Sequence, residues 1–123
     1  MAASSDEVVS IKRGNEIRLA ALNELNAAYG EMTSPLWNQK WESFSAEEKK
    51  RWSDTLVQIT TAIHELRMAT LRDILERLVA EEAALSAATQ ALHDRLQGLE
   101  KAEQILKAAA GFLSVVGRIV KLV

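Results

Sequence analysis

The two histidines are the side chains whose surroundings come nearest to a metal-binding or catalytic motif. Residues 64–68, with the sequence HELRM, begin like the zinc-binding helix of metalloproteases, in which a second histidine follows the first by four residues. A methionine stands at that position, so the pattern predicts no zinc site. A di-iron bundle needs a glutamate three residues before a histidine, but Thr61 precedes His64 and Gln90 precedes His93. Both histidines are therefore interpreted as surface or boundary residues.

The carboxylates form no acid–base pair that would indicate catalysis. Most have a cation one helical turn away, as Glu47 has Arg51 and Asp73 has Arg77, which is typical of a solvated helix surface. The chain contains no glycine-rich phosphate loop, no serine elbow motif and no cysteine. The sequence therefore predicts a protein that is not an enzyme and that uses no metal, no cofactor and no small-molecule substrate.

Length and composition indicate a single all-α domain. The chain has 123 residues, 48% of them hydrophobic and 26% charged, with one proline and five glycines, which are too few for many β-turns. The formal net charge of −2 predicts no nucleic-acid partner, because phosphate recognition needs a basic face. The charge is unevenly distributed, since residues 104–123 hold three cations and no acid. A basic, apolar end therefore follows an acidic body.

The first residues do not look like a secretory signal. Residues 1–7 are polar and acidic, whereas a signal peptide needs a basic start and an apolar run. The expected location is cytoplasmic, with peripheral association with a membrane as an open alternative.

Helical periodicity and stop signals divide the chain into four segments. We predict a first helix over about 6–32, a tryptophan-bearing turn over 33–45, a long helix over about 46–97 and a terminal amphipathic helix over about 99–123. Serine–glutamate capping boxes at Ser4–Glu7 and Ser45–Glu48 mark two of the helix starts, and Pro35 is the strong breaker between them.

Apolar residues in the long helix change register once and then follow a heptad pattern. One stripe ends at Leu66 and the next begins at Met68, where we expect a bend or a change of partner; the alanine-rich stretch 80–91 is a second place for a break. From Met68 to Leu106 the spacing is 3-4-3-4, as in a coiled coil. An unbroken helix over 46–97 would be about 78 Å long. We therefore predict an elongated helical hairpin or bundle that self-associates through this seam.

The terminal segment is the most distinctive part of the sequence. From residue 107 onward its polar side chains fall on one thin helical stripe, and almost all the remaining circumference is apolar. The predicted membrane- or partner-binding residues are the cations Lys107, Arg118 and Lys121 and the apolar anchors Phe112, Leu113, Val116, Ile119 and Val120.

Three interpretations of this terminal helix are open. It can be a central helix of the bundle, because wide apolar faces are ordinary in cores. It can lie on a membrane surface, with its cations at anionic headgroups. It can also span a membrane, although only ten residues, 108–117, separate its charges.

Four of the six aromatic residues lie within sixteen positions, at Trp37, Trp41, Phe44 and Trp52. They are interpreted either as a hydrophobic plug at one end of the bundle or as an anchor for a partner, because tryptophan is enriched at binding hot spots.

Taken together, the sequence predicts a non-enzymatic helical interaction protein. The leading hypothesis is a membrane-associated accessory or pore-forming component whose terminal helix binds a membrane surface or assembles in an oligomer. The alternative is a soluble adaptor or chaperone-like protein whose terminal helix is core and whose partner is another protein. In layout the chain resembles small phage-encoded and secretion-accessory proteins and helical pore-forming proteins, with no shared motif.

Overall fold

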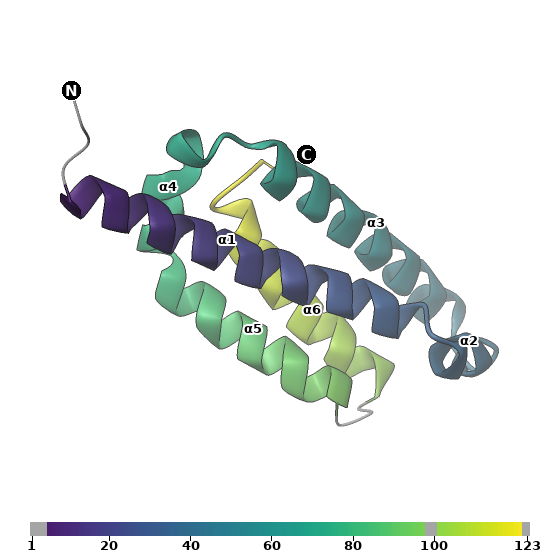
Figure 1. The fold of residues 1–123 in the computed structure, drawn as a ribbon. Helices are drawn as coiled ribbons and strands as arrows, with labels where there is room; N and C mark the ends of the chain where they lie inside the picture. The colour runs from purple at the N-terminus through teal and green to yellow at the C-terminus, as the bar shows by residue number, and fades with distance from the viewer. Residues whose placement is uncertain (1–4, 98–100, 122–123) are drawn as a thin grey trace.

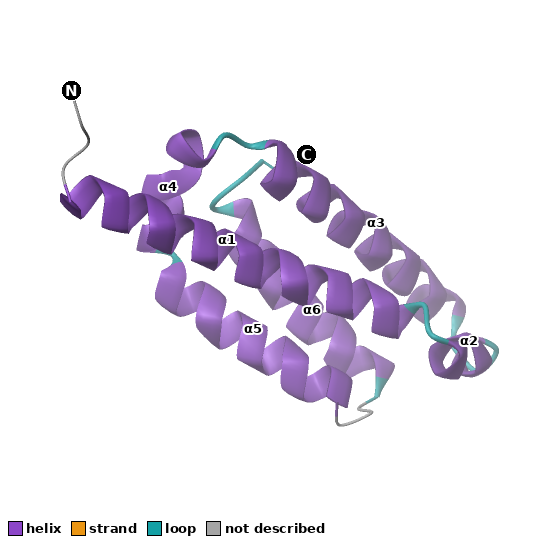
Figure 2. Ribbon diagram, in the orientation of Figure 1, coloured by secondary structure: helices purple, strands orange, loops and turns teal. Residues whose placement is uncertain are grey.

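The computed structural model describes residues 5–97 and 101–121, and these residues form six helices without a strand (Figure 2). The helices are α1 (Ser5–Met32), α2 (Pro35–Trp41), α3 (Ala46–Met68), α4 (Leu71–Ala80), α5 (Glu82–Gln97) and α6 (Ala102–Gly117). The prediction of an all-α chain is confirmed.

The four longest helices, α1, α3, α5 and α6, pack as a bundle. Helix α1 contacts α3 and α5, and α6 contacts the same two helices from the opposite side. Helices α1 and α5 run in one direction and α3 and α6 run in the other (Figure 1). The short helix α2 lies at one end of the bundle, and α4 lies at the other end against the first turns of α1. The molecule is thus a compact multi-helix bundle, and the predicted elongated hairpin and coiled-coil pairing are not confirmed.

The predicted long helix over 46–97 is divided into three helices at two places. The first break is at Ala69, whose backbone is extended, directly after the change of register between Leu66 and Met68. The carbonyl oxygen of Ala69 accepts a hydrogen bond of 3.0 Å from Arg18 on α1, so the break leaves this group satisfied. The second break is at Glu81, within the alanine-rich stretch where a bend was expected. These breaks turn the chain back on itself and allow the compact fold.

The helix start predicted at Ser45 is formed as a complete capping box. The hydroxyl of Ser45 accepts a hydrogen bond of 3.1 Å from the backbone of Glu48, and the Glu48 carboxylate accepts one of 3.0 Å from the backbone of Ser45. The capping box predicted at Ser4 lies outside the described residues. The segment predicted as a turn over 33–45 contains α2, which begins at Pro35 because proline fits the first turn of a helix.

Replacing Ser45 by alanine tests this cap. We expect the free energy of unfolding to fall by about 1 kcal/mol, because the backbone donor of Glu48 loses its acceptor. Urea denaturation followed by circular dichroism measures the change. Ser53→Ala, an exposed position within α3, is the control and should leave stability within about 0.5 kcal/mol. Equal losses in the two variants would argue against the capping box.

The terminal helix is shorter than its predicted extent of 99–123. Helix α6 ends at Gly117, and a turn follows through Val120, while residues 98–100 and 122–123 lie outside the described range. Beyond the helix end, the Arg77 side chain donates a hydrogen bond of 2.8 Å to the carbonyl oxygen of Ile119. This bond from α4 holds the chain in its non-helical course.

The core runs along the whole bundle axis and draws on every helix. The largest fully buried side chains are Phe112, Leu25, Met32, Ile59, Leu66, Leu78, Leu92, Ile105, Ile119 and Val116. Most leucines of the predicted heptad seam are buried within this one chain, including Leu78, Leu85 and Leu92, whereas Met68 at its start is 69% exposed. The seam therefore contributes to the internal core of the bundle.

Candidate functional site

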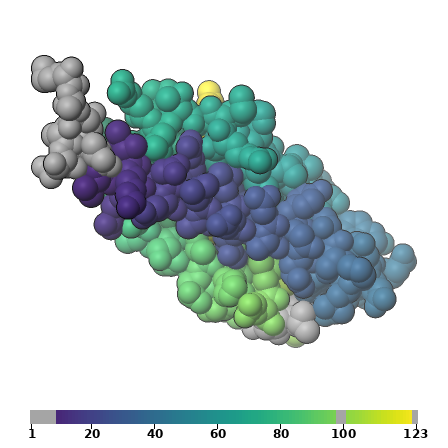
Figure 3. All heavy atoms as spheres, in the orientation of Figure 1, coloured from purple at the N-terminus to yellow at the C-terminus, as the bar shows by residue number. Residues whose placement is uncertain are grey.

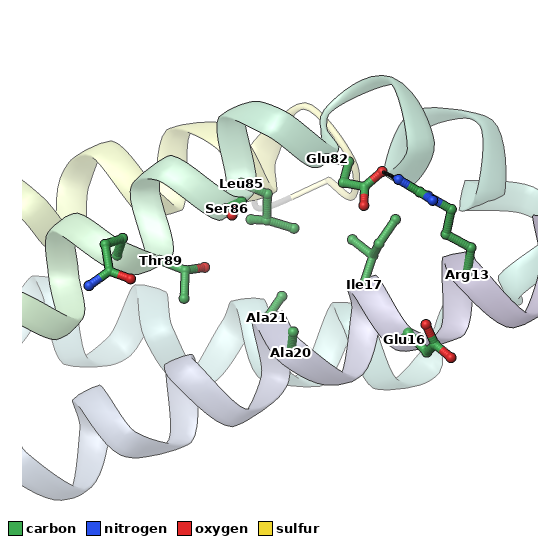
Figure 4. Close-up of a pocket in the computed structure, with 10 residues that line it drawn as sticks. Arg13, Glu16, Ile17, Ala20, Ala21, Glu82, Leu85, Ser86 and Thr89 are labelled. Carbon is green, nitrogen blue, oxygen red and sulfur yellow. Dashed lines mark hydrogen bonds and ion pairs between the residues drawn. The ribbon is translucent and has the colours of Figure 1, made fainter.

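The surface between α1 and α5 carries two hollows, one after the other along the two helices. The two helices lie side by side on one face of the molecule (Figure 3). A cavity of about 380 Å³ opens between their first halves (Figure 4), and it is lined by Arg13, Glu16, Ile17, Ala20, Ala21, Glu82, Leu85, Ser86, Thr89 and Gln90. A second hollow of about 480 Å³ follows one helical turn further along the same two helices, lined by Glu24, Ala27, Glu31, His93, Leu96 and Gln97. We call the two hollows together the α1/α5 groove.

An ion pair closes one end of the α1/α5 groove. Arg13 on α1 donates two hydrogen bonds to one carboxylate oxygen of Glu82 on α5, of 2.6 Å from Nη2 and 2.9 Å from Nε (Figure 4). Both side chains are partly exposed, so the pair contributes little to stability, on the order of 0–1 kcal/mol. Glu82 interrupts the predicted apolar seam, and the structure shows that it has a cation opposite it.

Glu24 is the buried charge of the groove. Its side chain is nine-tenths buried, and its Oε1 atom has no hydrogen-bond partner within the described part of the chain. Its Oε2 atom lies 3.9 Å from Nδ1 of His93, which is half exposed and pairs with a carboxylate only when the imidazole is protonated. Burial raises the pKa of the Glu24 carboxyl above its ordinary value, and the nearby His93 partly opposes this.

The sequence reasoning did not single out Glu24, although a signal for it exists. In the sequence, Ile17, Ala21 and Ala28 share one face of the first helix, and Glu24 falls on the same face, three residues after Ala21 and four before Ala28. An acid within such a line is expected to be buried. His93 was interpreted as a surface or boundary residue, and its position on the rim of the groove agrees with this.

The predicted binding residues lie partly on the terminal helix and partly beyond it. Lys107, Phe112, Leu113 and Val116 lie on α6, whereas Arg118, Ile119, Val120 and Lys121 follow its end at Gly117. The five apolar anchors, Phe112, Leu113, Val116, Ile119 and Val120, are all buried, with at most 7% of each side chain exposed. The cations Lys107, Arg118 and Lys121 are exposed, and Nε of Arg118 lies 3.1 Å from the Glu81 carboxylate. The amphipathic pattern of the sequence is therefore real, and α3 and α5 cover its apolar side.

The four aromatic residues form one cluster at the α2 end of the bundle. Trp37 and Trp52 are buried with ring centroids 4.9 Å apart, and Phe44 lies 5.3 Å from Trp52 and 5.8 Å from the half-buried Trp41. The cluster closes the core over the turns that join α1 to α3. Its position matches the interpretation as a hydrophobic plug.

One polar contact fixes this aromatic cluster to the end of α1. The indole nitrogen of Trp52 donates a hydrogen bond of 3.2 Å to the carbonyl oxygen of Met32. The last carbonyl groups of a helix have no partner within the helix, so this donor satisfies one of them in a buried place. Lys40 also lies over the Trp37 ring, with its ammonium 4.6 Å from the ring centroid.

Replacing Trp52 by phenylalanine removes the donor while keeping an aromatic ring. We expect the free energy of unfolding to fall by about 2 kcal/mol, because the carbonyl group of Met32 is left buried without a hydrogen-bond donor. Thermal and urea unfolding measure the change. Trp41→Phe is the control in the same cluster, and a loss as large as that of Trp52→Phe would show that ring volume, not the hydrogen bond, matters.

Within the described residues, no group of three or more acidic or histidine side chains is placed to hold a metal ion. Among the described helices, none combines the length and the apolar character needed to cross a bilayer. Comparisons with protein families, curated proteins and solved structures find no match for this chain.

Proposed function

We propose that this chain is a non-enzymatic helical adaptor that binds another protein and in which the terminal helix is part of the bundle core. The observation that carries the proposal is the burial of the apolar face of α6 against α3 and α5. The same side chains that would anchor the helix in a membrane already fill the centre of the bundle. This favours the adaptor hypothesis over the membrane-associated one.

To bind elsewhere, α6 would have to leave the contacts that bury its apolar face in the bundle. Each of Phe112, Val116 and Ile119 is essentially fully buried, and burial of such a side chain stabilises by about 1.5–3 kcal/mol. Moving α6 into a bilayer would keep these three side chains out of water, but it would expose to water the side chains that α6 covers on α3 and α5. A stable bundle therefore retains α6.

Membrane binding is the second candidate function. The observation that favours it is a group of exposed cations, here called the stripe: Lys107 on α6, the most apolar of the described helices, and Arg118 and Lys121 just after its end. In this hypothesis anionic headgroups attract the stripe, and the bundle opens to transfer the apolar face of α6 into the bilayer.

Deleting residues 105–123 tests the proposed role of α6. We expect the shortened chain to lose most of its helical circular dichroism signal or to aggregate, because α3 and α5 lose the helix that covers them. A chain lacking only residues 1–4 is the control and should stay folded. A folded, soluble product of the larger deletion would contradict the proposal, since α6 would then be separable from the body.

Sedimentation with liposomes tests the second candidate on the full chain. We expect no pelleting with anionic or neutral vesicles at low or high salt. Pelleting with anionic vesicles that is lost at high salt would overturn the adaptor proposal, and dye leakage from those vesicles would then distinguish surface binding from pore formation. Lys107→Gln/Lys121→Gln is the matched variant, because it removes the two stripe cations other than Arg118 without touching the core.

Self-association through the heptad seam stays a prediction. The seam leucines Leu78, Leu85 and Leu92 lie inside the bundle, so pairing between copies would need another surface or an opened chain. Sedimentation velocity over a range of concentrations measures it directly.

A further inference from the structure

The α1/α5 groove has the length and direction of a helix-binding site. It follows α1 from Arg13 to Glu31, a distance of about 27 Å at 1.5 Å per residue. The neighbouring helix α5 runs parallel to α1 along this stretch (Figure 1). A peptide helix of about eighteen residues matches that length.

The walls of the groove combine small, apolar and polar side chains. Ala20, Ala21 and Ala27 line it from α1, and α5 contributes Leu85 and Leu96 together with Ser86, Thr89 and Gln90. In Figure 4 the short side chains of Ala20 and Ala21 on α1 lie across the hollow from Leu85 and Thr89 on α5. The three alanines permit the backbone of an incoming helix to approach closely, and an amphipathic helix can set its apolar face against them and its polar flanks against the polar wall.

The charge of the groove indicates what the incoming helix must carry. The Glu24 carboxylate is nine-tenths buried, and one of its oxygens finds no donor among residues 5–97 and 101–121; a buried carboxylate is costly unless a donor or a cation meets it. His93 lies 3.9 Å away, too far for a hydrogen bond, and the other acid in the same hollow, Glu31, adds negative charge. At the far end of the groove, Glu82 already pairs with Arg13.

We propose that the α1/α5 groove binds an amphipathic helix of a partner protein, and that this helix places a lysine or arginine against Glu24 between apolar side chains. This inference rests on the proposed adaptor function and names the chemistry of the partner. Lysine and arginine fit because a long apolar stem crosses the apolar wall while its charged end supplies the missing donors.

A peptide selection on the full-length protein tests the site. The probe is a displayed library of eighteen-residue helical peptides, and the enriched peptides are then titrated by fluorescence anisotropy. We expect a basic residue at one fixed position of an apolar stripe. Glu24→Gln should weaken binding at least about tenfold, because a buried charge pair is lost. Replacing the basic residue of the peptide by glutamine should weaken binding to the original protein and have little effect on Glu24→Gln.

Two tryptophan substitutions give the matched comparison. Ala27 is exposed and lines the groove, so Ala27→Trp should fill it and reduce binding at least as much as Glu24→Gln. Ala91 is exposed on α5 and does not line the groove, so Ala91→Trp should leave the dissociation constant within about twofold. Circular dichroism confirms that each variant is folded, and Ala20→Trp replaces Ala27→Trp if the latter unfolds.

Three results would overturn the proposed site. These are a selection that enriches no peptide, peptides without a fixed basic position, and peptides that bind Glu24→Gln and Ala27→Trp as tightly as the original chain. The last result would be compatible with the adaptor function, but the protein would bind its partner through a surface other than the α1/α5 groove. The deletion of residues 105–123 and the liposome sedimentation test the adaptor function itself, independently of the groove.

Discussion

Replacing Phe112 by alanine lowers the free energy of unfolding by about 3–5 kcal/mol, the cost of removing a large side chain from a closed core. Phe112 is completely buried at the centre of α6, so its loss leaves a cavity bounded by neighbouring core side chains. This is a large part of the stability of a domain of this size, about 5–15 kcal/mol. The variant should therefore be close to unfolding at 37 °C.

Urea denaturation of the full chain, followed by circular dichroism, measures this loss. Val79→Ala is the control, because Val79 is 43% exposed on α4 and should change stability by less than about 1 kcal/mol. If Phe112→Ala behaved like the control, α6 would not belong to the core in solution, and the second candidate function would gain support.

Replacing Glu24 by glutamine stabilises the protein at neutral pH, by about 1–3 kcal/mol, because the uncompensated buried charge is removed. The gain depends on pH in a definite direction. The pKa of Glu24 is raised in the folded state, so the folded protein favours the protonated carboxyl. The stability that this proton contributes is fully present below the ordinary pKa and is lost as pH rises through the folded pKa. The difference between the variant and the original chain should therefore be small below the ordinary pKa of a glutamate, should grow as the pH rises from that value to the raised pKa, and should stay constant above it.

Thermal unfolding from pH 4 to pH 8 checks this dependence. His93→Gln is the companion variant, because losing the imidazole removes the group that holds the pKa of Glu24 down and should increase the destabilisation near neutral pH. Glu76→Gln, on the exposed face of α4, is the control and should change stability by less than about 0.5 kcal/mol at every pH. A flat difference between Glu24→Gln and the original chain across this range would contradict the assignment of a buried charge.

Local features of the fold were predictable because their causes are local. The helix cap at Ser45 depends only on the four consecutive residues 45–48. The helix break near Ala69 follows from the change of register between Leu66 and Met68. The exposed position of Lys107 on α6 follows from helical spacing alone, whereas the helix ends before it reaches Lys121. Each of these depends on side chains within a few turns of one another.

The features that escaped prediction depend on contacts between distant residues. A wide apolar face on α6 has the same periodicity whether a bundle or a bilayer covers it, so the sequence leaves open which one does. The compact fold requires α6 to lie between α3 and α5, and no spacing pattern specifies that choice. The unmet donor requirement of Glu24 likewise arises from the position of α5, which begins more than fifty residues later in the chain.

The order of the helices divides the bundle into two antiparallel hairpins, α1 with α3 and α5 with α6, and α4 carries the chain across between them. Each hairpin joins segments close in sequence, so each can form its own contacts before the two meet. The α1/α5 groove lies along the line where the hairpins join. A helix seated there would bridge both hairpins and, by binding only the assembled form, would oppose their separation. Occupancy of the groove would therefore be detectable as slower amide exchange in α6, a helix that the bound partner does not touch.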